Sequence, residues 1–264
     1  MNDCICMNII KLVKGRILQD NQAFEQFDIG ALGITDAIVC YSVVPMSKNS
    51  GIIEFVDECK PLKDFESGDG RILRYLISNN QGKYPPVNTL IYSSAIFTVL
   101  TYFLGVGDRH SDNILITTKG KFFHIDFGFI LGSDPKSGFI SVSAVRLSPV
   151  ILEACLQTEG EHTKERYSEF FNVCLNLYSI IRYYYSIFFH LLNTLSDSYP
   201  EKEIVQQLSQ RFFIEFSDEE ARHFFSTCLD TSINNLSDTI RNLLHDKAHL
   251  LAVPANFFKY WLPK

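Results

Sequence analysis

Apolar residues recur at helical spacing over most of this chain. They predict helices at residues 5–18, around 71–78 and, after the helix-breaking sequence Lys-Tyr-Pro-Pro, over a long apolar segment that ends at Leu104. From Ser148 to about Leu251 the pattern stays helical. Breaks in this second half are expected near Gly160, Pro200 and Ser217. The sequence Ser-Asp-Glu-Glu at the last break resembles a capping box at a helix start.

Short extended segments interrupt the helices in the first half. Ile38–Val44 and residues 51–56 are predicted to be two strands joined by a turn. Ile114–Thr117 and Lys121–Ile125 are predicted to be a second pair, joined by the sequence Thr-Lys-Gly. Residues 126–147 have no strong period and contain three glycines and a proline, so we expect an extended loop there.

Composition narrows the class of protein. The chain has 264 residues, of which 46% are hydrophobic and 20% charged. This is enough to bury a full core, and it is far from a disordered composition. The net charge of −6 and the pI near 5.6 give no support for a nucleic-acid partner. Contact with a membrane would therefore need a local patch.

Cysteine spacing and apolar runs indicate the compartment. Cys4 and Cys6 are the only close pair of cysteines, so reduced thiols are favoured over a zinc site. No signal peptide is evident after Met1. Residues 87–107 and 180–195 are strongly apolar, but their polar side chains favour buried core helices over membrane spans. These features favour a cytoplasmic protein.

Residues 105–132 carry the densest group of chemically active side chains. Asp108 is followed five residues later by Asn113, and Asp126 opens an Asp-Phe-Gly sequence. Kinases use this spacing for a catalytic-loop Asp, a metal-binding Asn and a metal-binding Asp. Phosphoryl transfer needs a loop that aligns the attacking hydroxyl group and side chains that hold Mg²⁺ on the phosphates. The spacing therefore predicts the catalytic half of a kinase.

The order of these motifs resembles one superfamily of kinases. Asp-Arg-His-x-x-Asn followed by Phe-His-Ile-Asp-Phe-Gly is similar to the phosphatidylinositol 3-/4-kinases and the protein kinases related to them, whereas ordinary protein kinases reverse the loop order. The segments around these motifs, with Tyr178–Arg182 and Arg211–Ala221, look most like class III phosphatidylinositol 3-kinases. Residues 136–147 resemble phosphatidylinositol 4-kinases instead, and Tyr41–Gly51 resembles the hinge of the related protein kinases.

The resemblance implies an α+β fold, which is kinase-like and bilobal, with a predominantly helical C-lobe and an incomplete N-lobe. Residues 1–57 are expected to form part of the N-lobe and the hinge, and residues 58–251 the C-lobe. The C-lobe would contain the catalytic loop, 105–113, and the activation loop, 126–147. Residues 252–264 are expected to form a C-terminal tail.

The resemblance also assigns the cofactor ligands. ATP would bind with Mg²⁺ or Mn²⁺, and Asp126 and Asn113 would hold the metal on the phosphates. Phe127 and Gly128 complete the nucleotide-binding Asp-Phe-Gly sequence.

Two assignments of the catalytic base stay open. The resemblance favours His110, which would take the proton of the inositol hydroxyl group or stabilise the γ-phosphate, with Asp108 orienting it. Imidazole, with an ordinary pKa of about 6.5, suits a general base. By spacing alone, Asp108 occupies the position of the protein-kinase base. Arg109 is expected to pair with activation-loop groups, His124 to lie in the core, and Asp112 to be a solvated carboxylate.

The activation loop bears on the substrate. Kinases that act on multiply phosphorylated inositides need several cations there. Only Lys136 and Arg146 are basic in residues 126–147, and Asp134 offsets one of them. This favours plain phosphatidylinositol as the substrate, whereas phosphorylation of the 3-hydroxyl group is implied by the resemblance alone.

The tail is a second candidate for membrane contact. Four aromatic residues with basic neighbours gather there: Phe257, Phe258, Tyr260 and Trp261. Such residues favour the membrane–water interface, and docking on the C-lobe as core is the equal alternative. The resemblance to class III enzymes further implies regulatory protein subunits and a peripheral location on endosomal or autophagic membranes.

One expected part of an active kinase is missing from the sequence. No glycine-rich loop and no strand lysine precede the first helix, and Lys11 and Lys14 on that helix are poor substitutes. A truncated lipid kinase is the favoured interpretation, beside a reduced enzyme and a catalytically dead pseudokinase or scaffold. A phosphatidylinositol 4-kinase and a related Ser/Thr protein kinase are the alternative enzymes.

Overall fold

The computed structural model describes most of the chain. The described residues are 2–20, 33–47, 50–66, 71–81, 86–136, 138–141, 145–156, 163–195 and 199–236. The α-helices are α1 (Asn2–Gly15), α3 (Arg71–Asn79), α4 (Val87–Phe103), α5 (Pro149–Leu156), α6 (Thr163–Tyr183), α7 (Tyr185–Leu195), α8 (Glu201–Phe212) and α9 (Asp218–Asn234). The short 3₁₀ helices are η1 (Ile17–Gln19), η2 (Ile34–Ala37) and η3 (Leu62–Phe65).

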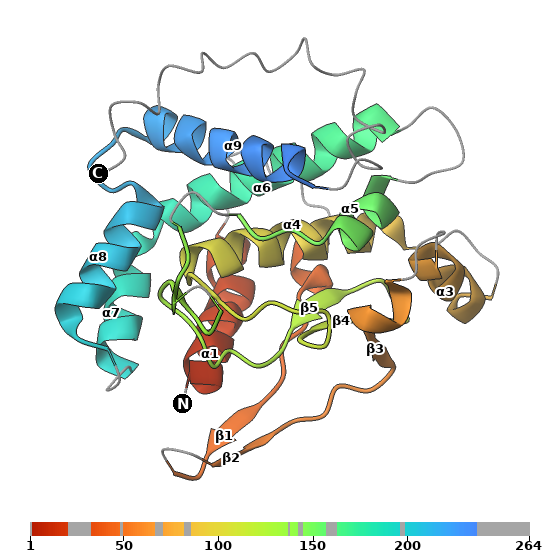
Figure 1. Ribbon diagram of the computed structural model, residues 1–264, viewed down its shortest axis with the longest axis horizontal. Coiled ribbons are helices and arrows are strands. Elements are labelled where there is room, and N and C mark those ends of the chain that lie inside the picture. Colours follow the sequence, from red (N-terminus) through yellow and green to blue (C-terminus); the bar gives the residue numbers. More distant parts are fainter. Residues whose placement is uncertain are drawn as a thin grey trace.

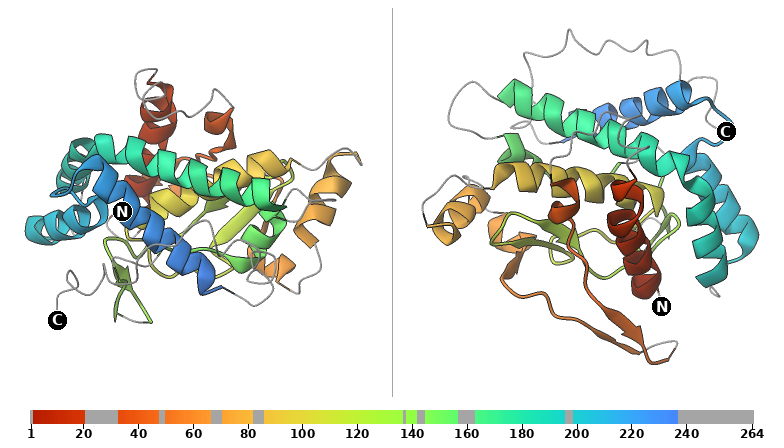
Figure 2. Two further views of the ribbon diagram at one scale, coloured as in Figure 1. Left: turned by 90° about the horizontal axis from the view of Figure 1, so that it is seen from above. Right: turned by 180° about the vertical axis from the view of Figure 1, so that it is seen from behind.

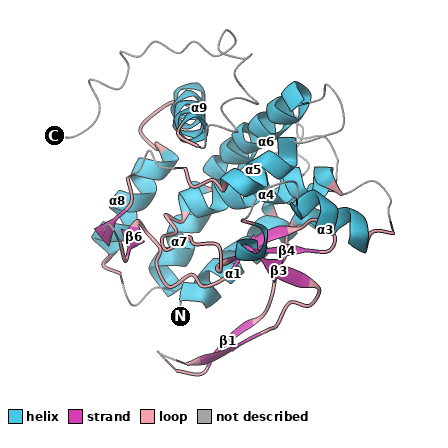
Figure 3. Cartoon of the chain, turned by 45° about the vertical axis from the view of Figure 1, so that its right-hand side comes forward, coloured by secondary structure: helices cyan, strands magenta, loops and turns pink. Residues whose placement is uncertain are grey.

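The strands are short and antiparallel. They are β1 (Val43–Pro45), β2 (Gly51–Ile53), β3 (Cys59–Pro61), β4 (Ile114–Thr117), β5 (Phe122–His124), β6 (Ser133–Asp134) and β7 (Gly138–Phe139). They form the hairpin β1–β2, the sheet β3–β4–β5 and the hairpin β6–β7. The fold is thus mixed α+β, mostly helical with small antiparallel sheets, as expected from the sequence (Figure 3).

Helix α4 is the centre of the core. It packs against α6 and α5 on one side and against β5 on the other, as Figure 1 shows. Its residues are mostly apolar on every face, with a few serines and threonines among them, and all but two are buried, as expected for a helix surrounded by other elements. The segment Val87–Leu104 is long enough to cross a membrane, but 89% of it is buried inside the protein. The predicted core helix is therefore confirmed.

The structure corrects several predicted boundaries. The strand predicted over Ile38–Val44 forms ladder bonds only from Val43, because Ile38 and Tyr41 are drawn into the core instead. The hydrophobic pattern does not predict the break at Tyr184 between α6 and α7, since no glycine or proline marks it. The predicted helical segment beyond residue 236 and the tail lie outside the described residues.

Other predictions are confirmed. The capping box at the start of α9 is present, with Ser217 and Glu220 each accepting a hydrogen bond from the other's backbone N–H. Among the described residues of the predicted loop over 126–147, turns and irregular backbone surround the two-residue strands β6 and β7. The seven cysteines are free thiols.

The hairpin β1–β2 projects from the body of the protein. Figure 2 shows it extending away from the helices in the rear view. Strand β5 packs against α4, and β4 and β5 carry the chain from the end of the catalytic loop to Asp126. This arrangement places the end of the catalytic loop beside the start of the Asp-Phe-Gly sequence.

Candidate active site

Two segments that are distant in sequence meet at the catalytic loop. The chain leaving α4 pairs with the segment that follows the Asp-Phe-Gly sequence. Leu131 N donates to Leu104 O at 2.7 Å, and Gly107 N donates to Phe129 O at 2.9 Å. The catalytic loop and the activation segment are therefore joined by backbone bonds before any side chain is considered.

Glycines permit this close approach. Gly105 has a positive φ of 56°, and a Cβ atom there would lie 2.5 Å from Gly132 N. A Cβ atom on Gly107 would lie 2.1 Å from Ser133 O. Real Cβ atoms do not tolerate such distances, so both positions require glycine if the two segments are to touch.

Asn113 is held in one orientation by its neighbours. Its side chain is buried, and Nδ2 donates to Asp108 O at 3.1 Å. Its own carbonyl accepts a bond from Ile125 N at 3.0 Å, one residue before Asp126. The fixed amide nitrogen leaves Oδ1 as the atom able to meet a cation. One network of backbone bonds thus joins Asp108, Asn113 and the start of the Asp-Phe-Gly sequence.

The Asp-Phe-Gly sequence is anchored from α1. Asp3 Oδ1 accepts a bond from Phe127 N at 2.9 Å, and Asn2 Nδ2 donates to Gly128 O at 3.0 Å. Phe127 is buried, whereas Asp126 is exposed and has a φ of 56°. Asp126 Oδ1 accepts from Gly128 N at 3.2 Å, which turns the carboxylate toward the loop.

Arg109 has a structural set of contacts. Its guanidinium donates to Gly107 O at 2.7 Å, to Ile125 O at 2.8 Å and to Asp126 O, and it lies over the ring of Phe127. Burial lowers the pKa of Arg109, and the nearby Asp126 carboxylate opposes this shift. The prediction that Arg109 pairs with activation-loop groups is confirmed, since these contacts bind the two segments together.

His110 is exposed and lies between two carboxylates. Its Nε2 is 4.0 Å from Asp108 Oδ2, and its Nδ1 is 3.7 Å from Asp112 Oδ2. Asp112 is also exposed and forms an ion pair with Lys63, whose hydrogen bond lowers the pKa of Asp112. The prediction of a solvated carboxylate at Asp112 is therefore confirmed. Each ring nitrogen of His110 thus has a carboxylate near it.

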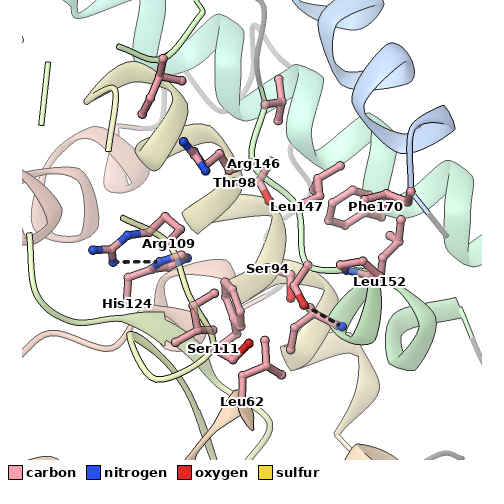
Figure 4. Close-up of a pocket in the computed structure, with 18 of the residues that line it drawn as sticks. Leu62, Ser94, Thr98, Arg109, Ser111, His124, Arg146, Leu147, Leu152 and Phe170 are labelled. Atoms are coloured by element: carbon pink, nitrogen blue, oxygen red, sulfur yellow. Dashed lines mark hydrogen bonds between the residues drawn. The ribbon is translucent and has the colours of Figure 1, made fainter. Parts of the chain in front are cut away.

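His124 lies in the core, as predicted. It is 5% exposed, and burial together with the neighbouring Arg109 lowers its pKa well below the ordinary value. Figure 4 shows Arg109 and His124 at one end of a cavity of about 530 Å³, with Leu152 and Phe170 toward the other end. Asp108, Asn113 and Asp126 do not line this cavity, so it is distinct from the candidate metal site.

The donor atoms at the loop fit a hard divalent cation. One carboxylate, from Asp126, and one amide oxygen, from Asn113, lie at the two ends of the bonded network described above. Mg²⁺ prefers oxygen ligands and is bound by few protein groups, with waters and phosphates completing its shell. Among the described residues, no three His, Cys, Asp or Glu side chains gather into a metal cluster. The site therefore suits a metal that arrives with a nucleotide.

The two predicted substrate contacts in the activation loop differ from each other. Lys136 is exposed, and only its backbone N–H is engaged, by Asp134 Oδ1 at 2.9 Å. Arg146 forms an ion pair with Asp134 at 2.8 Å. The predicted membrane-contact residues, Phe257, Phe258, Tyr260 and Trp261, lie outside the described residues.

The sequence analysis did not identify two anchors of the site. The helix predicted at residues 5–18 did not include Asp3, and Asp134 was treated only as an offset to a cation. The available signal was that both residues are acidic. Both side chains accept hydrogen bonds from backbone N–H groups, which every residue except proline carries, so no sequence pattern identifies these contacts.

Comparison with known proteins agrees with this geometry. The sequence pattern of the phosphatidylinositol 3- and 4-kinase family matches residues 66–204. The phosphatidylinositol 3-kinase VPS34 of Candida glabrata is 34% identical over 210 residues, covering 77% of this chain and 21% of that protein. The VPS34 of Arabidopsis thaliana is 32% identical over 78% of this chain and 26% of its own length.

The VPS34 of Saccharomyces cerevisiae is similar to the same extent, 32% identical over 79% of this chain and 24% of its own length. The chain thus spans about a quarter of the length of the curated relatives that it matches. The matched region contains the whole catalytic loop and the Asp-Phe-Gly sequence. On the motif geometry and this match together, the chain belongs to the phosphatidylinositol 3- and 4-kinase family of ATP-dependent phosphotransferases.

Proposed function

We propose that this chain is the catalytic portion of a lipid kinase that transfers the γ-phosphate of ATP to the 3-hydroxyl group of phosphatidylinositol. The observation that carries the proposal is the single bonded network that joins Asp108, Asn113 and the Asp-Phe-Gly sequence. The similarity to proteins named phosphatidylinositol 3-kinase supports the choice of hydroxyl group. The small number of cations in the activation loop supports a substrate without further ring phosphates.

The chain's own residues divide the chemistry between them. Asn113 and Asp126 would hold Mg²⁺ or Mn²⁺, which neutralises charge on the phosphates when the nucleotide is bound. His110, flanked by carboxylates, takes the proton of the inositol hydroxyl group, and Asp108 orients the ring. Arg109 keeps the catalytic loop against the activation segment.

Asn113 and Asp126 would hold the metal of a bound nucleotide. Lys14 on α1 donates to Ile38 O at 2.9 Å, so its ammonium group is engaged by the backbone. A bilobal kinase arrangement, with residues 1–57 as part of the N-lobe and hinge and 58–251 as the C-lobe, belongs to the same proposal.

The location and partners follow from the proposed substrate. Because phosphatidylinositol resides in membranes, the enzyme would act as a peripheral protein on endosomal or autophagic membranes. The aromatic tail residues would contact the bilayer, and regulatory subunits like those of class III enzymes would recruit the kinase.

A phosphate-transfer assay tests the proposal. The full chain is incubated with γ-labelled ATP, Mg²⁺ and phosphatidylinositol vesicles, and the ring position of the product phosphate is determined. Removing the metal ligand in Asp126→Ala should lower turnover by at least about 100-fold, because the developing charge loses its cation. Chelation of the metal should have the same effect.

The matched control is Glu203→Gln, which removes an exposed carboxylate of α8 and should leave turnover unchanged. Full activity in Asp126→Ala would overturn the site assignment. A 4-phosphate product or peptide phosphorylation would replace the proposed substrate by one of the alternatives. If the wild-type chain is folded but transfers no phosphate, the non-catalytic interpretation of this chain is favoured.

A further inference from the structure

Asp134 lies where the activation segment touches the catalytic loop. Its side chain is 7% exposed although it is a carboxylate. One oxygen accepts a bond from Asp108 N at 3.2 Å and from Arg146 Nη2 at 2.8 Å, and the other accepts from Lys136 N at 2.9 Å. This single side chain therefore connects the loop that carries the candidate base with the far end of the activation segment.

The burial of Asp134 makes its partners necessary. A buried carboxylate is unfavourable unless hydrogen bonds and an opposite charge compensate for the water it has lost. The two backbone N–H groups and the Arg146 guanidinium provide this compensation. The position of Asp134 is also fixed by its strand, since β6 pairs with β7 at Gly138. The Asp134 oxygen that accepts the bond from Asp108 N is thus held in a fixed position.

Asp108 needs such an anchor. Its φ of 51° lies in the left-handed region, which residues other than glycine occupy only when their surroundings hold them there. Its N–H is held by Asp134, and its carbonyl oxygen accepts bonds from Asn113 Nδ2 and from His110 N. The backbone at Asp108 sets the direction of the carboxylate beside His110.

We propose that Asp134, neutralised by Arg146, is a positioning residue that holds Asp108 in its catalytic conformation. This inference rests on the proposed kinase function for its kinetic consequence. Arg146 then acts through Asp134, as the counter-ion of a buried carboxylate, and does not contact a substrate phosphate. A change in the activation segment that separates Arg146 from Asp134 would loosen the catalytic loop without altering any residue that touches the substrate.

The first test compares Asp134→Asn with wild type in the phosphate-transfer assay. The amide keeps the shape and can still accept from Asp108 N, but it loses the charge pair with Arg146. We expect kcat to fall about tenfold or more, while the KM values for ATP and for phosphatidylinositol change less than twofold. Arg146→Gln should produce the same pattern, and Arg146→Lys should recover most of the loss.

The double variant Asp134→Asn/Arg146→Gln sharpens the test. Because it leaves no unpaired buried charge, its loss should be no larger than that of either single variant. If Arg146 contacts substrate instead, Arg146→Gln raises the KM for the lipid, Asp134→Asn does not, and the two effects multiply. That result would overturn the proposal. Glu203→Gln, an exposed carboxylate on α8, is the control for charge removal.

Hydrogen exchange separates this proposal from the proposed function. Backbone exchange in the peptide covering residues 105–113 should be at least tenfold faster in Asp134→Asn than in wild type, whether or not the chain transfers phosphate. Unchanged exchange in that peptide would overturn the positioning role even if the wild type is an active kinase. If Asp134→Asn fails to fold, the same exchange test is made on Arg146→Gln. This variant is easier to tolerate because the Arg146 side chain is 37% exposed and the Asp134 carboxylate is kept.

Discussion

The catalytic interlock, in which residues 104–107 lie against residues 129–134, and the hairpin β1–β2 are both places where two segments pair through backbone hydrogen bonds, and they differ in almost every other respect. Most residues of the interlock are buried, and a Cβ atom at Gly105 or Gly107 would clash with the facing backbone. The hairpin pairs three residues of each strand and exposes large apolar side chains to solvent. These are Val44, Met46, Ile52, Ile53 and Phe55, which are 51–82% exposed.

The difference shows what fixes a backbone in place. Arg211 of α8 lies near Gly105 of the interlock, is fully buried and donates to Tyr102 O at 3.1 Å. The hairpin contacts α1 through β1, but the apolar side chains named above stay exposed. An isolated two-stranded ribbon is marginally stable in water, so burial contributes what pairing alone does not. A group of exposed apolar residues is typical of a contact surface.

Gly107→Ala is the substitution expected to destabilise the interlock most. The new Cβ atom would meet Ser133 O at 2.1 Å, so the two segments must separate. We expect a loss of about 5 kcal/mol in the free energy of unfolding, or failure to fold, and no phosphate transfer. The matched control is Gly15→Ala at the end of α1, where a Cβ atom meets nothing within 4 Å and stability should be equal or slightly higher. Denaturant unfolding measures both, and a stable, active Gly107→Ala protein would contradict the interlock.

Truncation of a phenylalanine beside each region sharpens the comparison. Phe103 is fully buried beside Tyr178 and Phe212, so Phe103→Ala should lower the free energy of unfolding by about 3 to 5 kcal/mol. Phe55→Ala removes a side chain that is 82% exposed and should change it by less than about 0.5 kcal/mol. Thermal and denaturant unfolding compare the two variants. A large loss in Phe55→Ala would mean that the hairpin is packed against another part of the protein.

A smaller effect than that of Phe103→Ala is expected at the capping box of α9, which belongs to neither region. Ser217→Ala should lower the free energy of unfolding by about 1 kcal/mol, because Glu220 N loses its acceptor. The bonds from Ser217 also lower the pKa of Glu220. Since the folded state has the lower pKa, this stabilisation is present above the ordinary Glu pKa and is lost as pH falls from there through the lower pKa of the folded state. Unfolding measured between about pH 3 and 7 should show a weaker slope in Ser217→Ala.

Much of the fold was predictable because it depends on local patterns. Helical spacing identified α1, α3 and α4, and alternation with turn residues identified β4 and β5. The unpredicted break at Tyr184 has a tertiary cause. Tyr184 N bonds to Ile181 O while α7 turns to pack on α8 and α1, and no local residue requires this turn. The shortened strand before Val43 has a similar cause, since burial of Ile38 removes it from the ladder.

The chemically active residues of the candidate site could be predicted from the sequence, but the contacts that hold them in place could not. Asp108, Asn113 and Asp126 were identified from spacing, because metal and base chemistry restricts the residue types that serve it. The contact of Asp3 with Phe127 N was not identified, because a backbone N–H group leaves no mark in the sequence. Arg146 was assigned to the substrate from its charge, whereas in the structure that charge meets Asp134.

By itself, the sequence determined the class of this protein: the motif spacing restricts it to phosphoryl transfer, and the apolar periods restrict it to a helical body with small antiparallel sheets. Only the tertiary structure decided which charges meet. Asp134 and Arg146 are twelve residues apart, and Asp3 and Phe127 are separated by more than a hundred, so their contacts depend on how the chain returns to itself. The residue type determines which interactions a side chain can make, and packing determines its partner. This is because hydrogen bonds and burial act over a few ångströms, whatever the separation in sequence.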